Sequence, residues 1–168
     1  MFEETTNNTF ETEEKFDFNS MALDCMEFAR KYHEQYLIKG KKSDLDNAVD
    51  NYIDAIKFNP NIAEAYYRLA TLLWDKGEIN LDSAIEQCKS AINLSPDNPN
   101  AHIYASYFLE MAKNYDEAEK ELKQAIKLNP IKSARSRLSL ASMFLDKMQD
   151  SGINAKDFSQ SLYYMLSG

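Results

Sequence analysis

The sequence predicts an all-α fold in which antiparallel helix pairs stack into a solenoid of about three and a half units. The first observation is an alanine that recurs at Ala48, Ala84 and Ala118, at intervals of 36 and 34 residues. In each unit a second alanine follows seven residues later, two helical turns along the same face. Each unit then closes with a proline, and these are Pro60, Pro96 and Pro130. A unit of this length can bury its apolar face only against its neighbours, so the repeat predicts a stacked array.

The closing prolines separate two kinds of helix. In the helix before each proline, a large side chain follows the first alanine by one turn and fills the space beside it; these are Tyr52, Cys88 and Leu122. A proline ends that helix because its ring clashes with the preceding turn and it has no N–H to donate. After each proline a second amphipathic helix is expected, over residues 63–76, 100–113 and 133–147.

Helix-boundary residues agree with this period. Pro99 stands at an expected first helical position, where a missing N–H costs nothing. Gly40, Gly77 and Gly152 stand where helices of the second kind should end and turn. The local signals and the repeat therefore predict the same elements.

The two ends of the chain depart from the repeat. Residues 1–19 hold six acidic residues and one lysine, which predicts an acidic, disordered N-terminal arm. A last helix with an apolar stripe is expected over residues 155–166. It either caps the array, or dimerises, or continues into a longer chain, and the residues that would self-associate are Tyr163, Tyr164 and Leu166.

Charge and composition exclude several classes of protein. The 27 acidic and 19 basic residues give a net charge of −8, which does not favour nucleic acid or anionic lipid as a partner. No stretch has the ~20 apolar residues that cross a bilayer, so no direct membrane insertion is expected. The two cysteines, Cys25 and Cys88, are too few for a disulfide framework and fit a reducing compartment, so a cytoplasmic location is expected.

The repeat resembles the tetratricopeptide repeat (TPR) family, whose unit is a helix–turn–helix of about 34 residues. The residues that carry the resemblance are Ala63, Tyr66, Leu69, Ala70, Leu73, Gly77, Ala84, Ala91 and Pro96 in the second unit and Ala105, Leu109, Tyr115, Ala118, Ala125 and Pro130 in the third. The resemblance implies a right-handed solenoid with units of about 20–60, 61–96, 97–130 and 131–168. In the first unit the connection around residues 33–44 is too long for the family, so its first helix is expected to be extended.

The sequence does not predict an enzyme. Cys25 and His33 stand eight residues apart on one expected helix, roughly 12 Å, and cannot form a catalytic dyad. Cys88 falls at a helix-packing position, where a buried thiol acts as a small apolar side chain. His33 and His102 have no cysteine or carboxylate cluster at ligand spacing, so neither a metal site nor a cofactor is predicted.

In TPR proteins the first helix of each pair lines a concave groove that binds a ligand. Transferred residue by residue, the resemblance assigns to this groove residues of the second and third units: Tyr67, Arg68, Thr71, Trp74, Asn100, Ile103, Tyr104, Tyr107 and Met111, together with Glu64, Asp75 and Glu110. The first unit would add Met26, Glu27, Arg30 and His33. The fourth unit would add Arg135, Leu138, Ser142 and Leu145. Aromatic residues and arginine contribute most to binding at protein interfaces. Arg68 would be the electrostatic anchor, and Tyr67, Trp74, Tyr104 and Tyr107 the apolar platform. In the alternative interpretation these tyrosines only cover neighbouring helices, or the extended first helix fills the groove.

The ligand expected for this groove is a peptide segment of a partner protein. Chaperone adaptors of the family bind a C-terminal carboxylate with basic and amide residues, whereas the corresponding positions here are Glu27, Arg68, Asn100 and Tyr104. Only Arg68 has the required charge, so an apolar or mixed peptide fits better. The resemblance therefore predicts a non-catalytic interaction module, either an adaptor or a chaperone-like protein similar to the secretion chaperones of this family. The alternative function is a structural repeat segment that assembles through its apolar last helix.

Overall fold

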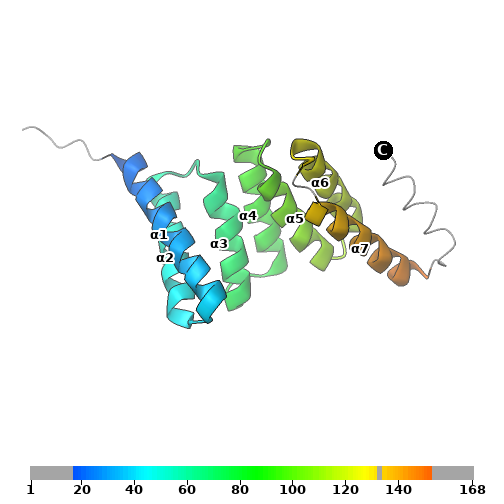
Figure 1. Ribbon diagram of the computed structural model, residues 1–168, viewed down its shortest axis with the longest axis horizontal. Coiled ribbons are helices and arrows are strands. Elements are labelled where there is room, and N and C mark those ends of the chain that lie inside the picture. The colour runs from blue at the N-terminus through cyan, green and yellow to red at the C-terminus, as the bar shows by residue number, and fades with distance from the viewer. Residues whose placement is uncertain (1–16, 132–133, 153–168) are drawn as a thin grey trace, which may run out of the picture.

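The structure is a computed structural model that describes residues 17–131 and 134–152. These residues form seven helices and no strand. In chain order they are α1 (Phe18–Lys39), α2 (Lys42–Phe58), α3 (Ala63–Lys76), α4 (Leu81–Leu94), α5 (Pro99–Met111), α6 (Tyr115–Leu128) and α7 (Ala134–Ser151). Figure 1 shows them stacked side by side in the order of the sequence. The predicted all-α solenoid of helix pairs is confirmed.

The helices begin and end at the residues that supply caps. Asp17 caps α1, since its carboxylate accepts hydrogen bonds of 3.1 Å from the N–H groups of Asn19 and Ser20. Pro99 is the first residue of α5, as expected. Gly77 ends α3 in the left-handed conformation with φ 71°, where a residue without Cβ pays no steric cost.

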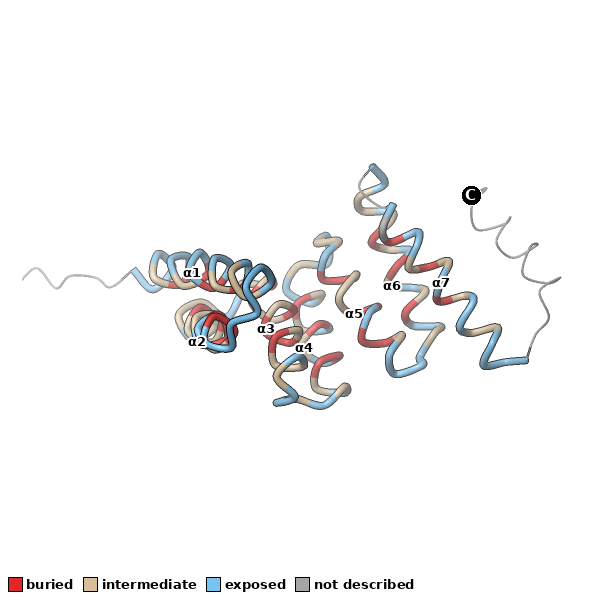
Figure 2. The backbone as a smooth tube through the Cα atoms, turned by 60° about the horizontal axis from the view of Figure 1, so that its bottom comes forward, coloured by how far each residue is buried: buried red, intermediate tan, exposed pale blue. Residues whose placement is uncertain are grey.

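The core lies where the two helices of each pair meet. The recurring alanines are buried there, and so are the large side chains of Tyr52, Cys88 and Leu122 that follow them by one turn. In Figure 2 the buried residues form one side of each helix, next to its neighbours. Close packing of a small residue against a large one on facing helices therefore holds each pair together.

The first unit confirms the expected extension of its first helix. α1 has 22 residues and continues to Lys39, so that Gly40 and Lys41 alone connect it to α2. Phe18 and Asn19, assigned above to the acidic arm, are instead the first residues of α1. The rest of the arm, residues 1–16, and the expected last helix at 155–166 lie outside the described residues.

Candidate binding surface

One face of the solenoid is formed by the outward side chains of α1, α3, α5 and α7, and we call it the odd-helix face. Direct contacts connect its helices. Arg30 of α1 is paired with Glu64 of α3, and Tyr67 of α3 is stacked on Tyr104 of α5. These contacts join α1 to α3 and α3 to α5 on this face.

An ionic cluster lies between α1 and α3. The Glu64 carboxylate accepts hydrogen bonds from Arg30 Nε (3.1 Å) and Nη2 (2.6 Å), and from Arg68 Nε (2.7 Å). Burial raises the pKa of Glu64, but the hydrogen bonds from the two guanidinium groups outweigh burial and lower that pKa below its ordinary value. Arg68, the expected anchor, is thus already engaged with a carboxylate.

Two buried polar atoms lie under this cluster. The Tyr52 hydroxyl and His33 Nδ1 have no hydrogen-bond partner among the described residues. Burial raises the pKa of Tyr52, and burial together with the charge of Arg68 lowers the pKa of His33. His33 and Met26 were expected on the groove surface, but both are buried, because α1 packs closely on α2.

The tyrosine stack joins α3 to α5. The rings of Tyr67 and Tyr104 are nearly parallel, with centroids 4.8 Å apart. Tyr67 is only 2% exposed, which differs from the expected exposed platform: its ring supports the half-buried Tyr104 from below. Thr71 is also turned inward, since its hydroxyl donates to the Tyr67 carbonyl over 2.9 Å.

The aromatic residues at the far end of α3 and on α5 form a second cluster. Phe108 is fully buried and meets Trp74 edge-on at 6.1 Å and Tyr107 edge-on at 5.1 Å between ring centroids. Trp74 is half-buried, whereas Tyr107 is 48% exposed. Phe108 therefore forms the floor of this region, and Tyr107 presents its ring to solvent.

Four of the exposed apolar side chains of the face lie on α5 and α7. Tyr107 and Met111 (42% exposed) come from α5, and Leu138 (72%) and Leu145 (50%) come from α7. We call these four residues the α5–α7 patch. Of the other groove residues expected on α5, Asn100 is exposed and Ile103 is half-buried.

Sequence reasoning missed part of the face on α1. Leu23 and Leu37 are more than half exposed and stand seven residues before and after Arg30. A spacing of seven puts all three on one side of a helix. That spacing was the available signal, but the transferred pattern follows the family's helix length and stops before Leu37.

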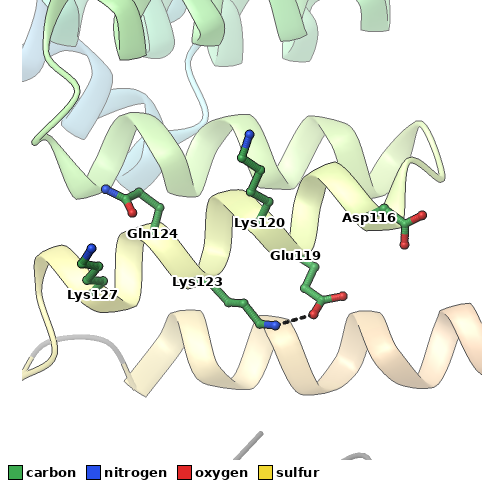
Figure 3. Close-up of a pocket in the computed structure, with 6 residues that line it drawn as sticks. All are labelled: Asp116, Glu119, Lys120, Lys123, Gln124 and Lys127. Carbon is green, nitrogen blue, oxygen red and sulfur yellow. Dashed lines mark ion pairs between the residues drawn. The ribbon is translucent and has the colours of Figure 1, made fainter. Parts of the chain in front are cut away.

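Two hollows lie elsewhere on the molecule. One, of about 560 Å³, is lined by α6 alone; Figure 3 shows its residues Asp116, Glu119, Lys120, Lys123, Gln124 and Lys127. Lys123 and Glu119 form an ion pair of 2.7 Å there. A second hollow of about 330 Å³ lies at the ends of α1, α2 and α3 and is lined by Tyr36, Gly40, Lys42, Leu45, Asp75, Lys76 and Glu78. Charged, solvated side chains dominate both, and neither has the apolar walls of a small-molecule site.

Metal sites and membrane-spanning helices are two further features to consider in the described part of the chain. No group of three or more His, Cys, Asp or Glu residues in it could hold a metal ion. Within the same residues, no helix combines the length and apolar character needed to cross a membrane. The residues predicted to self-associate, Tyr163, Tyr164 and Leu166, lie outside the described residues, so that prediction stays untested.

Comparison with known proteins identifies the repeat. A family described as "Tetratricopeptide repeat" matches residues 80–138, and one described as "TPR repeat" matches residues 40–77. Together the two stretches include more than half of the chain. The chain belongs to the tetratricopeptide repeat family. TPR arrays are protein-interaction modules, so membership supports that broad role here.

Solved TPR structures have the same fold. The NMR structure of the first TPR domain of human RPAP3 is 18% identical with a TM-score of 0.67, covering 81% of this chain and 99% of that one. The first TPR of Spaghetti (RPAP3), bound to the HSP90 peptide SRMEEVD, is 18% identical with a TM-score of 0.65, covering 76% and 96%. The TPR2B domain of yeast Sti1, in a pHsp70 complex, is 26% identical with a TM-score of 0.59, covering 76% and 98%.

Proposed function

We propose that this protein is a non-catalytic interaction module that binds a peptide segment of a partner protein across the odd-helix face. The observation that carries the proposal is the α5–α7 patch, four large apolar side chains exposed on adjacent helices of one face. Exposed apolar side chains are common when scattered singly, whereas a contiguous group marks an interaction site. An adaptor or a chaperone-like protein would use such a surface.

The comparisons support this choice of surface. Two of the similar structures are complexes with an HSP90 peptide and with pHsp70. In this family the first helix of each pair lines the ligand groove, and these helices correspond to α1, α3, α5 and α7. The cytoplasm is the proposed compartment, since Cys25 and Cys88 are free thiols.

The proposal is tested by selecting peptides from a random library displayed on phage. The native chain is compared with Tyr107→Ser plus Leu138→Ser, which removes one exposed member of the α5–α7 patch from each helix while keeping the buried core. Circular dichroism must first show that both proteins are equally helical. We expect the native chain to enrich related sequences and the double variant to lose them. If no sequence is enriched, or enrichment is the same for both proteins, the odd-helix face is not the binding surface.

A further inference from the structure

The α5–α7 patch has the size of one side of a short helix. Tyr107 and Met111 stand one turn apart on α5, and Leu138 and Leu145 stand two turns apart on α7, a length of about 10 Å. An amphipathic helix presents apolar side chains at i, i+3, i+4 and i+7 over the same length. The patch therefore matches a helical segment of two to three turns.

Two carboxylates flank the patch without a cation of their own. Glu110 precedes Met111 on α5, and Asp146 follows Leu145 on α7. Neither side chain has a hydrogen-bond or ion-pair partner within the described residues. Burial, and then the charge of Asp146, raise the pKa of Glu110, so the two carboxylates repel each other across the face.

Among the described side chains, the lysines of this region pair with other carboxylates. Lys113 is 2.9 Å from Asp150, and Lys147 is paired with Asp116. Arg137 precedes Leu138 and so points about 100° away from it around α7. Asp146 lies on the opposite edge of the stripe formed by Leu138 and Leu145.

We infer that the segment bound on the α5–α7 patch is an amphipathic helix whose apolar side is flanked by lysine or arginine. The inference rests on the proposed function and names the chemistry of the partner. Its apolar side chains cover Tyr107, Met111, Leu138 and Leu145, and a cation on it meets Glu110 and Asp146. A cation between two like charges removes their repulsion, so the bound state gains more than one ordinary surface ion pair.

The other half of the face carries charges of both signs. Arg30 and Arg68 share the single carboxylate of Glu64, so this cluster has one positive charge in excess. Glu34 is exposed further along α1 and offsets that charge. The α5–α7 patch is therefore the part of the face that favours a cationic segment, and the net charge of −8 adds to this preference.

The experiment uses two designed peptides that differ only in charge. Both carry leucine at i, i+3, i+4 and i+7, with lysine at the other positions in one peptide and glutamate in the other. Binding of the fluorescein-labelled peptides to the full chain is followed by anisotropy at physiological ionic strength. Two isosteric variants with equal charge change are compared: Glu110→Gln plus Asp146→Asn beside the patch, and Asp50→Asn plus Glu86→Gln, exposed on α2 and α4.

We expect the lysine peptide to bind, and the Glu110→Gln plus Asp146→Asn variant to bind it about tenfold more weakly. The Asp50→Asn plus Glu86→Gln variant should bind like the native chain. Equal weakening by both variants would mean nonspecific attraction to an acidic protein and would overturn the inference. Failure of the lysine peptide to bind would overturn it as well.

The remaining outcomes separate this inference from the proposed function. If the glutamate peptide binds more tightly and loses affinity on Tyr107→Ser plus Leu138→Ser, the face binds peptides but the inferred chemistry is wrong. If the library selection enriches patch-dependent sequences that are rich in Asp and Glu, the conclusion is the same. If the lysine peptide binds but is insensitive to Tyr107→Ser plus Leu138→Ser, both the inference and the proposed surface fail.

Discussion

The odd-helix face has two halves of opposite chemistry, and the division runs between α3 and α5. On α1 and α3, charged side chains satisfy one another, as Arg30 and Arg68 do around Glu64. On α5 and α7, apolar side chains such as Met111 and Leu138 are exposed with nothing packed on them in the described structure. The first half is held together by ion pairs between its own side chains, whereas the second half exposes apolar side chains to solvent.

This difference shows that the repeat determines the position of an outward side chain but not its chemistry. Arg68 and Tyr104 are 36 residues apart and occupy the same position of successive units, as do Thr71 and Tyr107. One scaffold position therefore carries an ion-paired cation in one unit and a stacked aromatic ring in the next. Function in such a protein depends on the outward residues, and stability depends on the inward ones.

The largest expected effect comes from the floor of the apolar half. Phe108→Ala removes a fully buried ring that contacts both Trp74 and Tyr107, so we expect the free energy of unfolding to fall by about 3–5 kcal/mol. Urea denaturation followed by circular dichroism measures this change. The matched control is Tyr107→Ala, half exposed, which should cost about 1 kcal/mol or less. Similar losses for the two variants would show that Phe108 is not the support of this half.

A smaller effect is expected from the ionic half. Glu64→Gln keeps the shape but removes the charge between Arg30 and Arg68, and we expect it to cost about 1 kcal/mol at neutral pH because the pairs are partly solvated. The pKa of Glu64 is lower in the folded chain than its ordinary value. Its stabilisation is therefore complete above the ordinary carboxyl pKa and is lost as the pH falls through the lowered one.

The pH dependence of stability tests the ion pairs of Glu64 with Arg30 and Arg68. Urea midpoints of the native chain and Glu64→Gln are compared at pH 7 and at successively lower pH. The gap between the two proteins should narrow as Glu64 becomes protonated. A gap that stays constant down to acid unfolding would show that the carboxylate charge is not what stabilises α1 against α3.

The smallest expected effect comes from the C-terminal ends of α3 and α5, one in each half of the face. Gly77 and Lys113 occupy the same position of successive units, and both are left-handed, with φ of 71° and 59°. Gly77→Ala should destabilise the chain by about 1 kcal/mol, because a Cβ is strained there. Lys113→Gly should be neutral or stabilising by up to about 1 kcal/mol, although it removes an exposed pair with Asp150. Thermal unfolding of both variants tests this, and a Gly77→Ala variant as stable as the native chain, or a clearly destabilised Lys113→Gly variant, would contradict the equivalence of the two positions.

The sequence predicted much of the fold because its signals are local. The recurring alanines, the closing prolines and Gly77 predicted the first helix of the second unit at residues 63–76, which are the bounds of α3. The large side chains of Tyr52, Cys88 and Leu122, one turn after each recurring alanine, predicted part of the core. These residues act within one or two turns of their own helix, so a single sequence is enough to interpret them.

The candidate site was predicted in position but only partly in character. Its helices and most of its outward residues follow from the repeat. The burial of Tyr67 could not be inferred, because it depends on Tyr104 from a unit 36 residues away. Glu64 stands four residues before Arg68 on α3, a spacing that allows an ion pair. That Glu64 is also shared with Arg30 of another helix could not be inferred from the sequence.

The sequence alone thus determined the number of helices in the repeated region, their order and the small-and-large packing that pairs them. Periodicity and helix-ending residues are properties of neighbouring positions in one chain. Only the tertiary structure decided which tyrosine is covered, that Glu64 is shared by two helices, and which carboxylates have no cation among the described residues. Those properties arise when helices of different units meet, where exposure and charge depend on side chains more than thirty residues apart.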